Sequence, residues 1–207
     1  RGSFPTTNGQ VNLHWAAGDR LVFLADLDGW PHLYSVPVAG GAPLLLTPGR
    51  GMAEYITMSP DRRTLVYATN IGTGADDIDR RHVDRVPVDR AAPVPLTPGT
   101  GLEWTPVVTG DGASVVYLSA DARRPPVPAV MAFGGGASRL IGSDRIPSDF
   151  PTAQLVTPRA VTFRSSDGIE VHGQLFEPPG AGRRPAVVFV HGGPPRQMML
   201  GWHYMDY

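Results

Sequence analysis

A repeat of about fifty residues constrains the fold of this chain more than any other feature. "HLYSVPV...PLLLTPG" at residues 32–49 recurs as "HVDRVPV...PVPLTPG" at residues 82–99. "MSPDRRTLVYAT" at residues 58–69 is echoed by "VTGDGASVVYLS" at residues 108–119, and an earlier copy, "WAAGDRLVFLA", occupies residues 15–25. Self-similarity at a fixed spacing indicates one structural unit that is stacked several times.

Each unit predicts four short strands. In the first unit "NLHWA" turns into "RLVFLA" at Gly18 and Asp19, and "HLYSVPV" turns into "PLLLT" at Gly40 and Gly41. Four-stranded units of this length are typical of β-propeller blades, whereas a β-sandwich gives no reason for a repeat in register. We therefore expect residues 1–141 to form about three blades at the C-terminal side of a propeller. Three blades cannot close a ring, so we expect the others to be supplied from outside this chain.

The pattern changes after residue 141. Residues 142–160 contain prolines and no repeat, which predicts a linker. "AVTFRSSDGIEVHGQLFEP" predicts two strands joined at Ser166, Asp167 and Gly168. "AVVFV" at residues 186–190 is an apolar run that suits a strand buried on both faces of an α/β sheet. A second domain is therefore predicted over residues 161–207.

The apolar run leads directly into His191, Gly192, Gly193 and Pro194. Glycines permit backbone conformations and close approaches that a Cβ atom would block. In α/β-hydrolases the loop after the third strand uses this freedom to turn a backbone N–H toward the reacting carbonyl, as half of an oxyanion hole. One such donor contributes on the order of 3 kcal/mol to transition-state stabilisation. Gly192 and Gly193 are the candidate donors.

These features together resemble the prolyl oligopeptidase family of serine peptidases, especially its dipeptidyl peptidase IV-like and acylaminoacyl peptidase-like branches. The resemblance rests on the TolB-like repeat with "SPD" at residues 59–61, the linker, "SSDG" at residues 165–168, and "VVFVHGGP" followed by Gln197 and an aromatic run. It implies a mostly β fold class: a partial β-propeller followed by the N-terminal strands of an α/β-hydrolase domain, truncated here. It also implies that the backbone N–H of Gly192 or Gly193 binds the oxyanion.

His191 stands where the dipeptidyl peptidase IV-like members of that family place a tyrosine whose hydroxyl binds the oxyanion. We expect His191 to shape the loop, with direct substrate contact as the alternative. It is not the base of a catalytic triad, because in this fold the histidine follows the nucleophile in the chain.

A nucleophile is not evident in the sequence. No G-x-S-x-G occurs, and the ten serines lie in predicted strands, turns and the linker. Ser138 follows three glycines at a predicted blade turn. We therefore expect this chain to lack the catalytic Ser, Asp and His and to be inactive alone, with the missing blades and catalytic domain as its partners in a longer peptidase.

The predicted function is that of a part of a serine peptidase that hydrolyses short peptides through an acyl-enzyme. Two alternatives stay open: a propeller interaction module whose hydrolase portion is vestigial, and a carboxylesterase. The sequence does not rank exopeptidase, endopeptidase and acylpeptidase activity, and a homo-oligomer is possible.

Composition excludes several other classes. All 18 basic residues are arginines scattered along the chain, which does not favour nucleic acid as a partner, and the absence of lysine removes Schiff-base and P-loop chemistry. There is no cysteine, and no apolar run approaches the ~20 residues of a membrane helix. Neither a cofactor nor a membrane partner is predicted, and the compartment stays open between cytoplasm, periplasm and secretion.

Three further groups of residues are candidate sites. The spacings of the histidines match no zinc pattern, and His32 and His82 occupy equivalent repeat positions, which favours a structural role. The acidic and basic residues at 76–81 are most simply a solvated loop between strands, with contact to an incoming peptide as the alternative. "GWHYMDY" at residues 201–207 predicts aromatic packing of a following helix, or a lining of the site.

Overall fold

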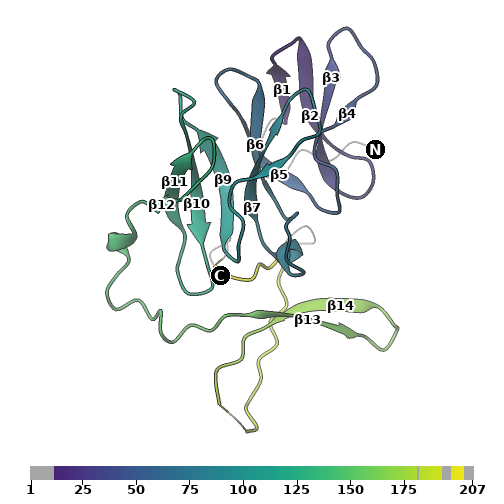
Figure 1. Cartoon of the computed structure of the whole chain (residues 1–207). Helices are drawn as coiled ribbons and strands as arrows, with labels where there is room; N and C mark the ends of the chain where they lie inside the picture. Colours follow the sequence, from purple (N-terminus) through teal and green to yellow (C-terminus); the bar gives the residue numbers. More distant parts are fainter. Residues whose placement is uncertain (1–11, 181, 193–196, 203–207) are drawn as a thin grey trace.

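The computed structural model describes residues 12–180, 182–192 and 197–202, and its regular structure is mainly antiparallel β-sheet. Three four-stranded sheets follow one another along the chain (Figure 1). The first contains β1 (Leu13–Ala16), β2 (Arg20–Asp26), β3 (Pro31–Pro37) and β4 (Leu44–Leu45). The second contains β5 (Ala53–Met58), β6 (Thr64–Thr69), β7 (His82–Pro87) and β8 (Val94–Pro95). The third contains β9 (Leu102–Val108), β10 (Ser114–Ala120), β11 (Val127–Ala132) and β12 (Arg139–Leu140).

Each sheet orders its strands as they occur in the chain, so each strand pairs with the next one of its blade. The sheets therefore have the architecture of propeller blades, and the predicted fold class of about three four-stranded units is confirmed. None of the described residues belongs to a helix that is long and apolar enough to cross a bilayer.

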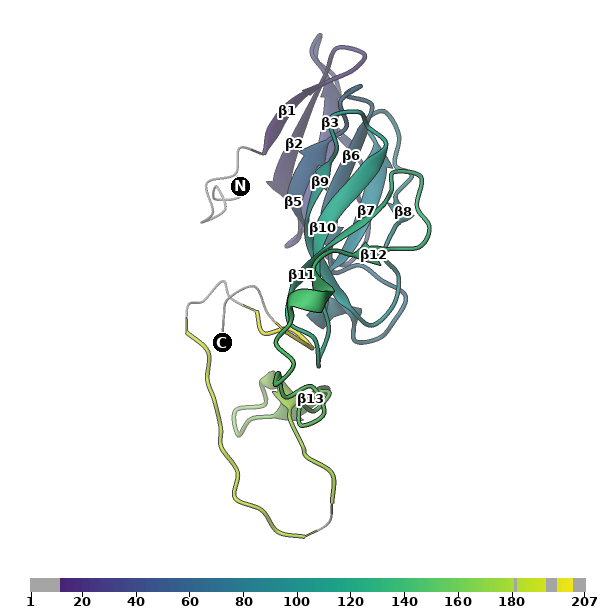
Figure 2. The same cartoon turned by 90° about the vertical axis from the view of Figure 1, so that its left-hand side faces the viewer.

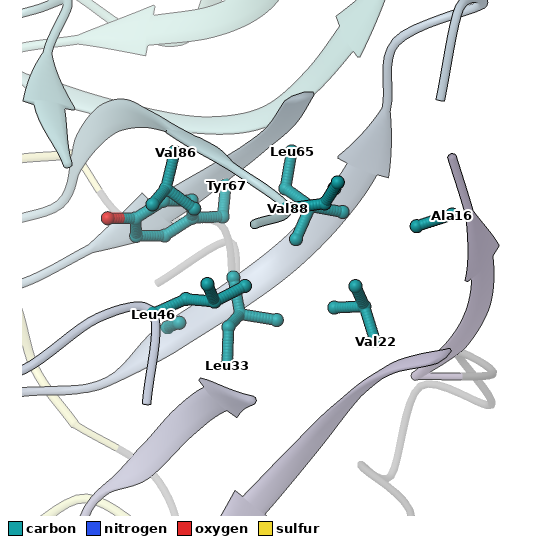
Figure 3. Close-up of a cluster of buried hydrophobic side chains, with 9 residues drawn as sticks. Ala16, Val22, Leu33, Leu46, Leu65, Tyr67, Val86 and Val88 are labelled. Carbon is teal, nitrogen blue, oxygen red and sulfur yellow. The ribbon is translucent and has the colours of Figure 1, made fainter. Parts of the chain in front are cut away.

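The middle blade is buried on both faces by its two neighbouring blades. Alternate residues of a strand point to opposite sides of the sheet, so each strand contributes side chains to both contacts. Leu65 and Tyr67 of β6 join an apolar cluster with Val22 and Leu33 of the first blade (Figure 3). Val66, which lies between them in the chain, joins a different cluster with the third blade. That cluster also contains Val83, Leu96, Val108, Val115, Tyr117, Ala129 and Met131. Burial of one such aliphatic side chain contributes about 1.5–3 kcal/mol, so these contacts stabilise the stack of blades.

Arginines of the second and third strands also join neighbouring blades. Arg20 of β2 donates through Nε to the backbone oxygen of Val88, 3.2 Å away in the second blade. Arg85 of β7 donates to the backbone oxygen of Phe133 at 2.9 Å, and its guanidinium lies 5.5 Å from the centre of the Phe133 ring. Each junction thus combines apolar burial with a hydrogen bond from an arginine.

The same side-chain turn closes three hairpins. In the second blade the Ser59 hydroxyl donates to Asp61 Oδ1 at 2.6 Å, and that oxygen accepts the backbone N–H of Arg63 at 3.0 Å. In the third blade Thr109 and Asp111 form the equivalent bonds with the same two lengths. The third example, Ser165 with Asp167 and Ile169, closes the hairpin of β13 (Arg159–Arg164) and β14 (Glu170–Leu175). The strand pair predicted around Ser166, Asp167 and Gly168 is therefore present.

Strands β5 and β9 carry an irregularity that the sequence did not indicate. The register of each shifts against its partner, between Glu54 and Thr57 in β5 and between Trp104 and Val107 in β9. Tyr55 has φ 51° and Thr105 has φ 53°, a conformation that costs an L-residue about 1–2 kcal/mol. The two positions lie fifty residues apart, so the strained backbone conformation recurs with the same spacing as the sequence repeat.

The region after the blades lies beyond one end of them in both views (Figures 1 and 2). Residues 142–160 contain only one short 3-10 turn, η2 (Ser143–Arg145), before β13 begins. The strand predicted at residues 186–190 is not formed: these residues belong to no sheet, and Val187 is 93% exposed. The physical reason is that a strand buried on both faces needs a neighbour on each side, and the described residues supply none.

A comparison of the blade turns yields a stability prediction. Arg62 has φ 59° at the position where the third blade has Gly112 with φ 70°. Replacing Arg62 by glycine relieves this strain, so Arg62→Gly should raise the free energy of unfolding by about 0.5–1 kcal/mol in urea titrations. Arg63→Gly is the matched control and should not stabilise, because Arg63 has no positive φ. A less stable Arg62→Gly variant would contradict the strain argument.

Candidate functional site

The connection between β6 and β7, residues 70–81, is the most elaborate loop at the end of the blades that faces the hairpin; we call it the second-blade loop. It contains a 3-10 turn, η1 (Asp77–Asp79). The interpretation of its charged residues as a solvated loop is wrong in part, since Asp77 and Arg81 are buried. Asp77 accepts the backbone N–H of Gly74 at 2.6 Å and Nη1 of Arg80 at 3.2 Å. Burial is tolerated because the charges satisfy one another inside the loop.

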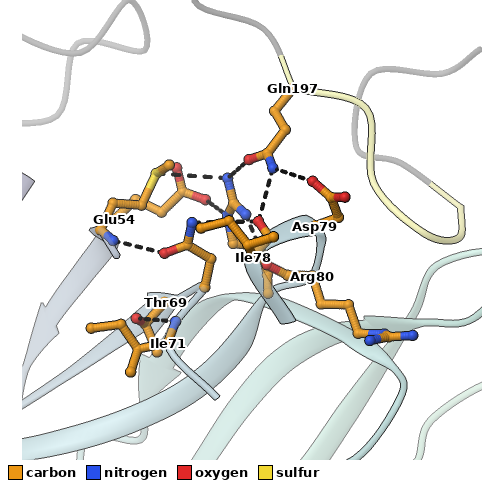
Figure 4. A network of polar contacts seen from close by, with 10 residues as sticks. Glu54, Thr69, Ile71, Ile78, Asp79, Arg80 and Gln197 are labelled. Atoms are coloured by element: carbon orange, nitrogen blue, oxygen red, sulfur yellow. Dashed lines mark hydrogen bonds and ion pairs between the residues drawn. The ribbon is translucent and has the colours of Figure 1, made fainter. Parts of the chain in front are cut away.

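Arg81 donates hydrogen bonds within a polar network that includes Glu54, Arg80 and Gln197, which are labelled in Figure 4. Its side chain is 2% exposed, and its Nε donates to Glu54 of β5. Nη1 donates to the backbone oxygen of Arg80 at 2.8 Å, and Nη2 donates to Oε1 of Gln197 at 3.0 Å. A buried guanidinium needs a counterion and acceptors for its other N–H groups, and these three partners provide them.

Gln197 is fixed at both ends of its carboxamide. Besides accepting from Arg81, it donates through Nε2 to the backbone oxygen of Ile78 and to Oδ1 of Asp79, each at 2.8 Å. These partners lie 116 to 119 positions earlier in the chain. Gln197 is therefore attached to the second-blade loop.

Residues 197–202, which we call the C-terminal strap, continue this attachment across two blades. The backbone N–H of Leu200 donates to Asp79 at 3.0 Å, and that of Trp202 donates to Asp121, next to the end of β10, at 3.1 Å. Met199 is 1% exposed and packs in an apolar cluster with Ala68 and other residues. Of residues 201–207, for which aromatic packing of a following helix was predicted, only Gly201 and Trp202 are described, and neither is helical.

The predicted oxyanion loop lies just before the strap. His191 is half-buried, with Nδ1 3.4 Å from the backbone oxygen of Gly192. Gly192 is exposed and belongs to no strand, and a Cβ atom placed on it would meet nothing within 4 Å. Gly193 lies outside the described residues. The chain itself thus imposes no steric need for glycine at 192, and the role of these residues in an oxyanion hole stays a prediction.

Behind the second-blade loop, His82 lies between two carboxylates. Its Nε2 is 3.5 Å from Oδ1 of Asp77, and its Nδ1 is 3.4 Å from Oε2 of Glu103 in the third blade. Burial alone would lower the pKa of His82, but Glu103 and Asp77 outweigh it and raise that pKa above its usual value. His32, at the equivalent position, is also buried, 3.4 Å from Thr47 Oγ1 and 3.5 Å from Asp28 Oδ2. These contacts of His32 and His82 are consistent with the structural role predicted for both histidines.

Asp84 of β7 is buried opposite Tyr67. Its Oδ1 has no hydrogen-bond partner in the described structure. Burial disfavours the charged form and raises the pKa of Asp84 to about 6, although His82 acts in the opposite direction. Burial, together with the charge of Asp84, also raises the pKa of Tyr67.

Among the described residues, two other candidates show no arrangement of a site. Ser138 lies between β11 and β12, in the predicted blade turn, and its hydroxyl contacts that of Tyr117. Within the described ranges, no group of three or more histidine, aspartate or glutamate side chains is arranged to hold a metal ion.

Comparison with known proteins finds solved structures with a similar fold. The chain is similar to puromycin hydrolase, with a TM-score of 0.74 and 21% sequence identity over 92% of this chain and 30% of that one. It is also similar to a puromycin-hydrolyzing peptidase from Mycobacterium tuberculosis (TM-score 0.73, 21% identity, 93% of this chain and 30% of that one). A third is dipeptidyl peptidase 4 from Porphyromonas gingivalis (TM-score 0.64, 16% identity, 81% of this chain and 23% of that one).

These neighbours establish the fold of the chain, which spans less than a third of the length of each of them. No protein-family model and no curated protein matches the sequence.

The raised pKa of Asp84 predicts a pH dependence of stability. Between about pH 4 and pH 6 the folded chain keeps a proton on Asp84 that the unfolded chain releases, so stability falls as pH rises. His82 acts in the same direction, because its stabilising charge is complete below its ordinary value of 6.5 and is lost as pH rises through its raised pKa.

Asp84→Asn removes only the first contribution. The loss of unfolding free energy between pH 4 and pH 7.5 should be smaller in this variant by roughly 2 kcal/mol, measured by urea titration at each pH. Asp89→Asn is the control, since that exposed carboxylate follows the same strand. An unchanged pH dependence in Asp84→Asn would show that the buried carboxyl does not titrate as described.

Proposed function

We propose that this chain is part of a serine peptidase that hydrolyses short peptides through an acyl-enzyme. In this proposal residues 1–141 are blades that wall off the active site, residues 142–160 are a linker, and residues 161–207 begin an α/β-hydrolase domain. The nucleophile belongs to the remainder of a longer protein. The substrate is a peptide that is small or unfolded enough to pass the blades.

One observation carries the proposal: the similarity to puromycin hydrolase covers 92% of the chain, more than the blades alone could supply. A likeness limited to the blades would support any propeller protein. The order of blades, linker, hairpin and the residues 191–194 matches the peptidase resemblance of the sequence, and so supports peptide-bond hydrolysis.

The reaction assigns a distinct task to each part. A serine oxygen attacks the substrate carbonyl carbon, and its proton passes through a histidine base to the leaving amine as the C–N bond breaks. Water then attacks the acyl-enzyme by the same route, and the serine proton is restored. The backbone N–H of Gly192 or Gly193 would stabilise the negative oxygen formed in both steps. His191 would shape this loop.

The proposal predicts two different results for the longer protein and for this chain. The full-length protein should react with a fluorophosphonate probe at one serine beyond residue 207 and should release chromophore from dipeptide and acyl-amino-acid amides. This chain alone should show neither reaction. Absence of both labelling and turnover in the full-length protein would reject the peptidase proposal in favour of an interaction module, and turnover of esters without amides would indicate a carboxylesterase.

A further inference from the structure

The C-terminal strap forms hydrogen bonds with the blades and with the hairpin. The backbone N–H groups of Leu200 and Trp202 donate to the backbone oxygens of Asp79 and Asp121, which belong to the second and third blades. From the other side, Gln174 of β14 donates through Nε2 to the backbone oxygen of Met198 at 2.8 Å. The strap is therefore held between the blades and the hairpin.

The apolar side chains of the strap make the attachment specific in position. Met199 and Leu200 are 1% and 3% exposed, and Trp202 lies 5.6 Å from Phe150 between ring centroids. A Cβ atom on Gly201 would lie 3.1 Å from Leu102 Cδ1 and 3.2 Å from the backbone oxygen of Asp121, so the backbone approaches the third blade closely. Sliding the strap by one residue would place a Cβ atom at this close approach, and the neighbouring atoms would have to move to accommodate it.

Gln197 is the first residue of the strap and lies five positions after Gly192. Only one orientation of its side-chain amide satisfies these hydrogen bonds. The oxygen faces a donor, Arg81, while the nitrogen faces the acceptors of Ile78 and Asp79. Arg81 is in turn held by Glu54 of β5, the first strand of the second blade. This chain of contacts connects the interior of a blade to the end of the predicted oxyanion loop.

We propose that Gln197 is a positioning residue, through which Arg81 and the second-blade loop fix the loop that carries Gly192. The inference rests on the proposed function and adds to it that the second blade takes part in setting the oxyanion geometry. A loop tethered only by its preceding segment would sample many positions, and displacements near 1 Å can reduce catalysis by about 100-fold. The tether restricts that freedom without itself touching the substrate.

The sharpest variant is Gln197→Glu in the full-length protein, because it keeps the shape of the side chain. The introduced carboxylate could still accept from Arg81, but its second oxygen would face two acceptors, Ile78 and Asp79, and repel them. We expect the Leu200 amide to exchange with solvent at least about tenfold faster, since local opening of the strap becomes easier. We also expect kcat to fall by roughly 10- to 100-fold while KM changes less than about threefold.

Rescue separates positioning from general damage. Adding Asp79→Asn to Gln197→Glu restores a donor opposite the new carboxylate and should raise kcat at least about fivefold over the single variant. Gln154→Glu, in the exposed linker, introduces the same charge and should change neither exchange nor kcat.

The inference is overturned if Gln197→Glu leaves the Leu200 amide protected, or if the strap opens and kcat stays within about twofold of wild type. A wild-type protein that does not react with fluorophosphonate would instead reject the proposed function. Amide exchange alone would then decide whether Gln197 holds the strap.

Discussion

The structure depends on the stacking of small sheets face to face. A four-stranded sheet of short strands cannot bury its apolar side chains by itself, so each blade is stable only against the next one. The middle blade shows the consequence: Leu65 and Tyr67 serve one junction while Val66 serves the other. Because both faces are used, the strands lack clean alternation of apolar and polar residues, and the hydrophobic pattern of any single strand is weak. The repeat, rather than the pattern, carries the information about the fold.

Buried polar and charged side chains replace the apolar clusters at one end of the blades. At the end of the blades that faces the hairpin, buried charges are paired across elements: Arg81 with Glu54, and His82 with Asp77 and Glu103. Such pairs contribute less to stability than burial of apolar surface of the same size, but leaving one member unpaired is costly. They therefore fix which elements must meet at this end. The strap attaches at the same end. The buried charge pairs therefore lie in the part of the molecule that bears on the proposed function.

Sequence reasoning succeeded where structure is local and failed where it is not. The blades, the turn that holds Ser138 and the hairpin around Asp167 follow from repeats and turn residues, which act over a few positions. The bond between Arg81 and Gln197 joins residues 116 positions apart, and no periodicity indicates such a partner. The error at residues 186–190 has a related cause, because an apolar run shows that a segment tends to be buried but does not say what covers it. For the candidate site, the sequence singled out Gly192 and its neighbours but missed the strap.

The unequal lengths of the blade connections have a further consequence. The second and third strands are joined by residues 27–30 in the first blade, 121–126 in the third and 70–81 in the second. Loop-closure entropy grows only with the logarithm of length, so the longest of these costs about 1 kcal/mol more than the shortest. By contrast, inserting a single residue within a strand would shift its register and move the side chains beyond it to the other face. Lengthening the connection at one end of a blade thus costs little free energy and makes that blade differ from its neighbours. The length of this connection can therefore change during evolution while the strands of the blades stay the same.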